Sequence, residues 1–203
     1  MTDVLDKFGD WIKEGFIIYK ENLGVLILAS LIAFLLIGVT LGILAGPMLA
    51  GLIMIVLRLR DKKQPPPTAG EVFQGFQYFL PSFLFCIVWG VILVAVCLIL
   101  AFIPYLGNFL LVCICIAAEV FLMFGLFLIV DQKMDFWSAS MASIEKVKPA
   151  FLPFLGLALV AGILGQIGAV ACGIGVIVTM PINYTILAVV YRDVFGGGTP
   201  SQT

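Results

Sequence analysis

One acidic residue occupies the middle of an apolar segment, where a charged side chain is costly. Glu119 lies near the centre of the run Phe109–Val130, and no basic residue accompanies it there. Acids within membrane-spanning segments are rare, and they are usually functional or paired with another polar group. Glu119 therefore has two interpretations. It is either a functional group, which binds a proton or cation or contacts another subunit, or a neutral acid that is hydrogen-bonded between helices.

Three polar residues near the end of the chain could meet this carboxyl group. They are Gln166, Asn183 and Tyr184, and each interrupts an otherwise apolar run. Hydrogen bonds between membrane helices contribute on the order of 1 kcal/mol each, so these residues could simply hold helices together. With Glu119 they form a candidate polar membrane site, which could bind a solute only if the side chains face one another.

The remaining chemistry-bearing residues give little support for catalysis. The chain has no histidine, which removes the commonest transition-metal ligand and the usual haem ligand. No nucleophile elbow, zinc-protease motif or phosphate-binding loop is present. The cysteines lie in apolar runs without a C-x-x-C pair, which is typical of small packing residues; they are Cys86, Cys97, Cys113, Cys115 and Cys172. We expect no catalytic residues, no metal, no cofactor and no enzymatic activity.

The composition predicts the environment of these residues. Hydrophobic residues make up 63% of the chain and charged residues 11%, against roughly 45–50% and about 25% in soluble domains. A soluble protein of this length could not bury so much apolar surface, so we expect a polytopic, all-α membrane protein. The net charge of −1 gives no reason to expect nucleic-acid binding. The expected partners are membrane lipids and other membrane protein subunits, or a second copy of the chain.

The positions of the basic residues predict the topology. They leave three long stretches without Lys or Arg: Leu23–Leu57, Phe79–Gln132 and Ala150–Tyr191. One crossing needs about 20 residues, so each stretch suits two spans and an outer turn. Basic residues mark the cytoplasmic side. We therefore expect six transmembrane helices, with both termini cytoplasmic and outer turns at about Gly42–Pro47, Ile103–Asn108 and Ala171–Gly175.

The same pattern occurs three times along the chain. An amphipathic surface helix precedes each pair of spans, with a capping box at Thr68 and Glu71 and an N-cap at Asp135. Each second span ends in a charged exit: LRLRD, LIVDQ and VYRDV. We expect one membrane domain, residues 1–203, of three parallel hairpin repeats at about 3–61, 68–132 and 135–194, with a flexible tail at 195–203.

Small residues recur at every fourth position in the first predicted hairpin. They are Gly38, Gly42, Gly46 and Ala50. Such a stripe allows a neighbouring backbone to approach closely. We expect a helix-packing face there, either within the protein or against a partner.

Residues 71–195 resemble a known family. The segments EVFQGFQYFLPSFLF and LFLIVDQKMDFWSA are similar to its middle part, and the sequence from FWSASMASIEKVKPAFL to VVYRDVFG is similar to its closing hairpin. The family is a widespread group of bacterial six-helix integral membrane proteins without an established function. The resemblance implies an inner-membrane location and six helices, and it implies no activity or active-site residue.

Two functions of different classes fit these observations. We favour a non-catalytic membrane subunit or scaffold that binds other membrane proteins. The alternative is a small transporter or channel that uses Glu119 with Asn183 and Gln166. Whether these polar groups line a cavity connected to water distinguishes the two.

Overall fold

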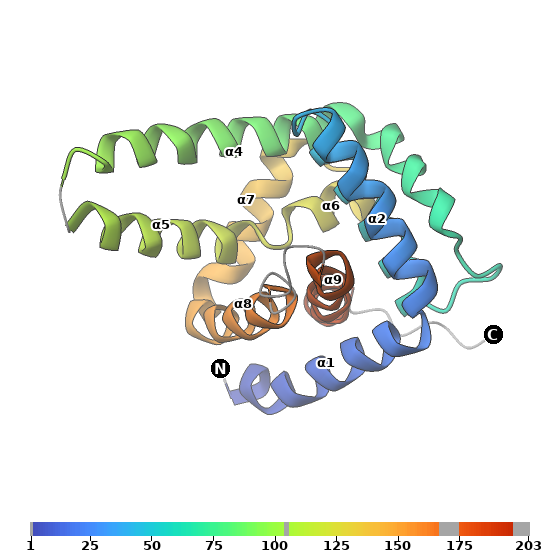
Figure 1. The fold of residues 1–203 in the computed structure, drawn as a ribbon. Helices are drawn as coiled ribbons and strands as arrows, with labels where there is room; N and C mark the ends of the chain where they lie inside the picture. Colours follow the sequence, from blue (N-terminus) through green and yellow to red (C-terminus); the bar gives the residue numbers. More distant parts are fainter. Residues whose placement is uncertain (1, 104–105, 167–174, 197–203) are drawn as a thin grey trace.

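The computed structural model describes residues 2–103, 106–166 and 175–196, and within these ranges all regular structure is helical (Figure 1). The all-α class is therefore confirmed. The helices are α1 (Thr2–Glu21), α2 (Leu23–Val39), α3 (Ala45–Arg60), the 3₁₀ helix η1 (Ala69–Tyr78), α4 (Phe79–Leu100), α5 (Leu106–Leu122), α6 (Gly125–Gln132), α7 (Phe136–Val147), the short 3₁₀ helix η2 (Lys148–Ala150), α8 (Phe151–Gln166) and α9 (Gly175–Val194).

Several of these helices are compatible with a multi-pass membrane protein. In the described part of the chain, four helical segments are long and apolar enough to cross a bilayer: Ala69–Leu100, Leu106–Gln132, Phe136–Gly165 and Gly175–Val194. The pair α1–α2, bent by 86°, could supply a fifth. Helix α3 has 16 residues, or about 24 Å at 1.5 Å per residue, which is short for a bilayer. Six spans thus remain a prediction.

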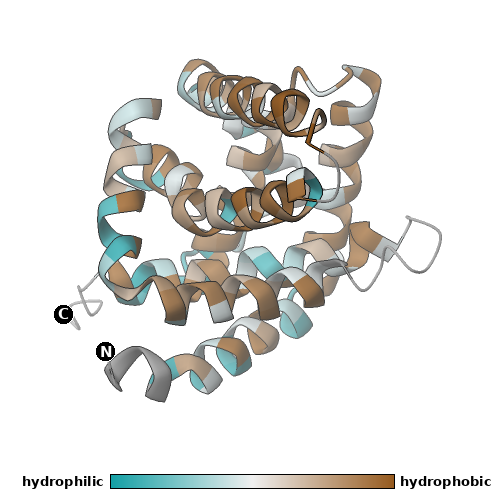
Figure 2. Ribbon diagram, turned by 90° about the vertical axis from the view of Figure 1, so that its left-hand side faces the viewer, coloured by the Kyte–Doolittle hydropathy of each residue, from teal (hydrophilic) through white to brown (hydrophobic). Residues whose placement is uncertain are grey.

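Three helical hairpins, α2–α3, α4–α5 and α8–α9, form the body of the molecule. They do not run parallel to one another. In Figure 1 the α4–α5 hairpin projects to the left, whereas α9 is seen nearly end-on; the turned view in Figure 2 shows α4 and α5 end-on instead. The outer half of the α4–α5 hairpin carries many exposed apolar side chains, among them Val91, Leu98 and Phe109.

The amphipathic segments connect these hairpins in a ring. Helix η1 packs on α3 and α2, α7 packs on α4, α5 and α6, and α1 packs on α9 and α8. Each surface helix therefore covers a hairpin of another predicted repeat unit. The first helix covers the last hairpin, which closes the ring.

Glycines allow the closest of these contacts, between α3 and η1. A Cβ atom on Gly51 would collide with the backbone of Val72, and one on Gly75 would collide with the carbonyl of Pro47. Gly15 of α1 similarly faces the backbone of Ile186 in α9. These glycines are in the surface helices and their partners, outside the stripe that the four-residue spacing predicted.

The predicted stripe is only partly a packing face within the chain. Gly46 faces the backbone of Ser82, and Ala50 is fully buried. A Cβ on Gly38 or Gly42 would meet no atom within 4 Å. The stripe is interrupted because α2 ends at Val39, and Gly42 lies in the turn with a φ of +87°.

Both predicted helix starts are present. The Thr68 N–H donates to Glu71 Oε1 at 3.0 Å, so the capping box forms, although the helix that follows is 3₁₀. The Asp135 carboxylate accepts from the N–H groups of Trp137 and Ser138, both at 3.1 Å. Local side chain to backbone bonds of this kind depend only on sequence spacing, which is why they could be predicted.

A serine of α7 forms hydrogen bonds with the backbone where α5 and α6 are separated, a helix break that was not predicted from the sequence. The expected span Phe109–Val130 is interrupted between α5 and α6. The Ser143 hydroxyl donates to the Phe121 carbonyl at 2.7 Å and accepts from the Phe124 N–H at 3.3 Å. Nearby, Trp89 Nε1 donates to Ser140 Oγ at 2.9 Å. The helix break is thus compensated by hydrogen bonds from the next surface helix.

The packed chain continues past the predicted start of the C-terminal tail. Phe195 was expected to begin a flexible tail, but its ring lies 5.3 Å from that of Tyr191 and 5.4 Å from that of Phe124, so the packed chain extends at least this far. The rest of that tail, 197–203, and most of the outer turn expected at Ala171–Gly175, with Cys172, lie outside the described residues.

Candidate functional site

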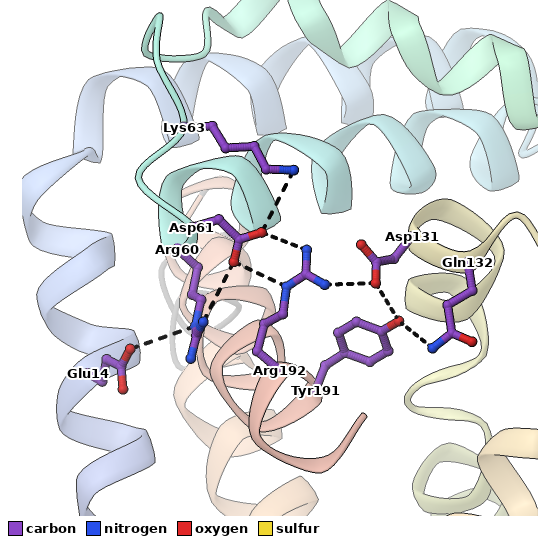
Figure 3. Close-up of polar contacts among 8 residues, drawn as sticks. All are labelled: Glu14, Arg60, Asp61, Lys63, Asp131, Gln132, Tyr191 and Arg192. Atoms are coloured by element: carbon purple, nitrogen blue, oxygen red, sulfur yellow. Dashed lines mark hydrogen bonds and ion pairs between the residues drawn. The ribbon is translucent and has the colours of Figure 1, made fainter. Parts of the chain in front are cut away.

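The charged ends of the three hairpins meet at Arg192. Its Nη2 donates to Asp61 Oδ2 at 2.6 Å and its Nε to Asp61 Oδ1 at 3.1 Å, while Nη1 donates to Asp131 Oδ2 at 2.8 Å (Figure 3). Asp61 follows α3, Asp131 lies near the end of α6 and Arg192 lies near the end of α9. One guanidinium group therefore joins all three charged exits. We call Arg192, Asp61 and Asp131 the exit network.

Tyr191 connects the exit network to the core. Its hydroxyl donates to Asp131 Oδ2 at 2.9 Å and accepts from Gln132 Nε2 at 3.4 Å. Its ring is fully buried and stacks on Phe127 at 5.4 Å and on Phe195 at 5.3 Å. Because this ring cannot move freely, the carboxylate that it binds is held in a fixed orientation.

Further ion pairs surround the exit network and attach the surface helices. Arg60 lies 3.8 Å from Glu14 and 3.6 Å from Asp61, and Lys7 lies 3.1 Å from Asp193. Arg58 is paired with Glu71, the residue that also caps η1. Acids of α1 and η1 thus bind basic residues of α3, and a lysine of α1 binds an aspartate of α9.

The ion pairs of Arg192 should stabilise the fold more than the peripheral Lys7–Asp193 pair does. The side chains of Arg192, Asp61 and Asp131 are 16%, 18% and 24% exposed, whereas those of Lys7 and Asp193 are 54% and 36% exposed. Exposed pairs contribute about 0–1 kcal/mol. Removing one partner of a fully buried pair costs about 3–5 kcal/mol, so these partly buried pairs should contribute an amount between the two values.

The exit network was not predicted as a site. The three exits are visible in the sequence as a repeat, but each exit alone resembles an ordinary solvated helix end. The available signal was that an aspartate follows the apolar run in every exit, at Asp61, Asp131 and Asp193. The pairing itself joins residues 131 positions apart, so only the tertiary fold specifies it.

The predicted polar membrane site is partly assembled. Glu119 of α5 and Asn183 and Tyr184 of α9 together line two adjoining cavities, of about 220 and 550 Å³. Ala158 of α8 lines both as well. Gln166 ends α8, and its side chain lies outside the described part of the chain. Three of the four predicted side chains therefore face the same space.

No direct bond joins these groups. The Glu119 carboxyl makes no hydrogen bond or ion pair with any described residue, and the residue is exposed. A Cβ on Gly162 would lie 3.9 Å from Glu119 Oε1, so this glycine leaves room beside the carboxyl group. The arrangement could hold a small polar solute or water between an acid, an amide and a phenol.

The described residues also bear on metal and disulfide sites. No group of three or more His, Cys, Asp or Glu residues there could hold a metal ion. The described cysteines are all free: Cys86, Cys97, Cys113 and Cys115. Comparison of the chain with protein-family models, with curated proteins and with solved structures gives no match. The proposals below therefore rest on the fold, on the exit network and on the polar membrane site at Glu119.

Proposed function

We propose that this protein is a non-catalytic integral membrane subunit or scaffold that binds other membrane proteins. It would lie in the bacterial inner membrane with both termini in the cytoplasm. The long apolar helices support the membrane location. The convergence of charged exits at Arg192 supports placing one end of all three hairpins at the cytoplasmic surface, because basic residues near helix ends favour that side.

An apolar groove carries the proposal of protein binding. It has a volume of about 550 Å³ and lies between the turn after α2 and one face of α4. Small residues line it, among them Gly42, Ala45, Gly90 and Ala95. Transmembrane helices associate where small residues let backbones come close, so a partner helix would fit here. Gly42 thus serves as part of a partner face, one of the two roles expected for the stripe.

Substitution of a groove glycine tests this function. A Cβ on Gly90 meets nothing within 4 Å, so Gly90→Leu should fill the groove without disturbing the fold. Gly24→Leu is the matched control, because Gly24 is also helical and unobstructed but lies outside the groove. Each variant is purified in mild detergent and co-eluting membrane proteins are identified. We expect a partner that is retained by the wild type and the control and lost by Gly90→Leu; retention by all three would contradict the proposal.

A second function rests on the two cavities beside Glu119. A small transporter or channel needs a polar site within its membrane-spanning part. The shared lining of Glu119, Asn183 and Tyr184 supplies such a site. Under this alternative the acid would bind a proton or a cation during transport, and its substitution by Gln should abolish flux in reconstituted vesicles.

A further inference from the structure

A different cavity opens beside the exit network. Its volume is about 410 Å³, and four cationic side chains line it: Arg58, Lys63, Lys133 and Arg192. They come from α3, from the segment after it, from the end of α6 and from α9. We call this space the basic cavity.

Only part of the positive charge is neutralised within the protein. Arg58 pairs with Glu71, and Arg192 pairs with Asp61 and Asp131. Lys63 Nζ lies 4.0 Å from Asp61 Oδ2, beyond hydrogen-bonding distance, and its side chain is 60% exposed. Lys133 forms no ion pair or hydrogen bond with any described residue. Lys133 is thus unpaired, and Lys63 is held only by a long ion pair to an aspartate that Arg192 already binds, so both ammonium groups are available to an external anion.

Neutral donors, an apolar wall and one acid, Asp131, complete the cavity, and the carboxylate of Asp131 is paired with Arg192. The Tyr78 hydroxyl and the Gln64 amide line it, and neither makes a hydrogen bond to a described residue. Met54, Leu57 and Val130 form its apolar part. Such a combination suits an amphiphile, whose charged group binds the donors while its carbon chain contacts the apolar wall.

We propose that the basic cavity binds the phosphate group of an anionic phospholipid. Ammonium and hydroxyl groups are suitable donors to phosphate oxygens. The cavity lies where all three hairpins end in charged residues, which in a membrane is the depth of the lipid headgroups. This inference relies on the membrane location proposed above, and a soluble phosphorylated compound would use the same donors. The experiment therefore separates the two sources.

The full-length protein in neutral detergent is titrated with phosphatidylglycerol, with phosphatidylcholine and with inorganic phosphate while thermal unfolding is followed. A ligand that binds the native state raises Tm in a saturable way. The test variant Lys63→Gln/Lys133→Gln removes the two ammonium groups that are available to an external anion. Lys13→Gln/Lys148→Gln is the control, because these lysines are also exposed but lie outside the cavity.

We expect phosphatidylglycerol, but not phosphatidylcholine, to raise the Tm of the wild type and the control. The half-saturating concentration should be about tenfold or more higher for the test variant, the scale of a lost charge-assisted hydrogen bond. Lys63→Arg/Lys133→Arg should respond as the wild type does. Protection by inorganic phosphate alone would keep the phosphate site but assign it to a soluble ligand. Equal protection by phosphatidylcholine, an unaltered response of the test variant, or no protection by either phosphate source would overturn the proposal.

Discussion

Arg192 and Asp61 are 131 positions apart in the chain, yet two guanidinium nitrogens bind both carboxylate oxygens, at 2.6 and 3.1 Å. This bidentate geometry fixes the orientation of α9 relative to α3 as well as their separation. The remaining guanidinium nitrogen binds Asp131 at 2.8 Å. The pairing therefore determines how the three hairpins converge.

The first prediction concerns this arginine. Arg192→Leu leaves the partly buried Asp61 and Asp131 without their common partner, so we expect the free energy of unfolding to fall by about 2–3 kcal/mol. Arg192→Lys keeps the charge but cannot bind both acids in the same planar geometry, so its loss should be intermediate. Denaturation in detergent measures both. The control Lys7→Leu, which breaks an exposed pair, should cost about 1 kcal/mol or less; an equal loss for Lys7→Leu and Arg192→Leu would contradict this ranking.

The second prediction compares two helical glycines. Gly51→Ala places a Cβ into the backbone of Val72, and overpacking typically costs about 1–3 kcal/mol. Gly38→Ala meets open space in α2 and should be neutral or slightly stabilising, because alanine favours the helix. Thermal unfolding of the two variants tests the difference. If both behave alike, η1 does not pack on α3 as closely as described.

The third prediction concerns Glu119. Glu119→Gln keeps the shape and the hydrogen-bonding capacity, so the fold and the assembly should be preserved. Glu119→Leu should change the stability by less than about 1 kcal/mol, because the exposed carboxyl makes no hydrogen bond or ion pair with a described residue. Proton or cation flux in reconstituted vesicles distinguishes the two proposed functions: a flux that Glu119→Gln abolishes favours transport, and its absence in the wild type favours the subunit.

The fourth prediction is a pH effect at the start of α7. Hydrogen bonds from the Ser138 side chain and from backbone N–H groups lower the pKa of Asp135 below its ordinary value. The carboxylate thus stabilises the fold above the unfolded pKa of about 3.9, and this contribution disappears as the pH falls through the lower, folded value. Melting curves at decreasing pH should show a smaller acid-induced loss of Tm for Asp135→Asn than for the wild type. Identical pH profiles would show that this cap does not contribute.

The fifth prediction tests the orientation. Asn108 is exposed and lies in the first turn of α5. If both termini are cytoplasmic, Asn108→Cys should react with an impermeant thiol reagent in intact cells. Lys63→Cys, beside the basic cavity, should react only after the membrane is opened. The background is a variant without the native cysteines. Labelling of Lys63→Cys alone from outside would reverse the topology.

Features set by short-range spacing could be predicted from the sequence. The caps at Thr68 and Asp135 and the helical hairpins follow from local patterns of polar and apolar residues. The break between α5 and α6 could not, because the partner that compensates it, Ser143, belongs to a later helix. The four-residue stripe could not tell which of its members pack within the chain, because that depends on tertiary neighbours: Gly46 faces the backbone of Ser82, whereas Gly42 faces none. The grouping of Glu119 with Asn183 could be suggested, but only the packing of α5 and α9 on α8 placed them on one cavity.

The closed ring of surface helices has a consequence for biosynthesis. Helix α1 precedes α9 in the chain by more than 150 residues, but the surface on which it packs belongs mainly to α9. During translation Trp11 and Tyr19 therefore stay uncovered until α9 has been made, whereas both are buried in the folded protein. The N-terminal amphipathic helix can dock only after α9 has been synthesised, so its docking is a late step of folding.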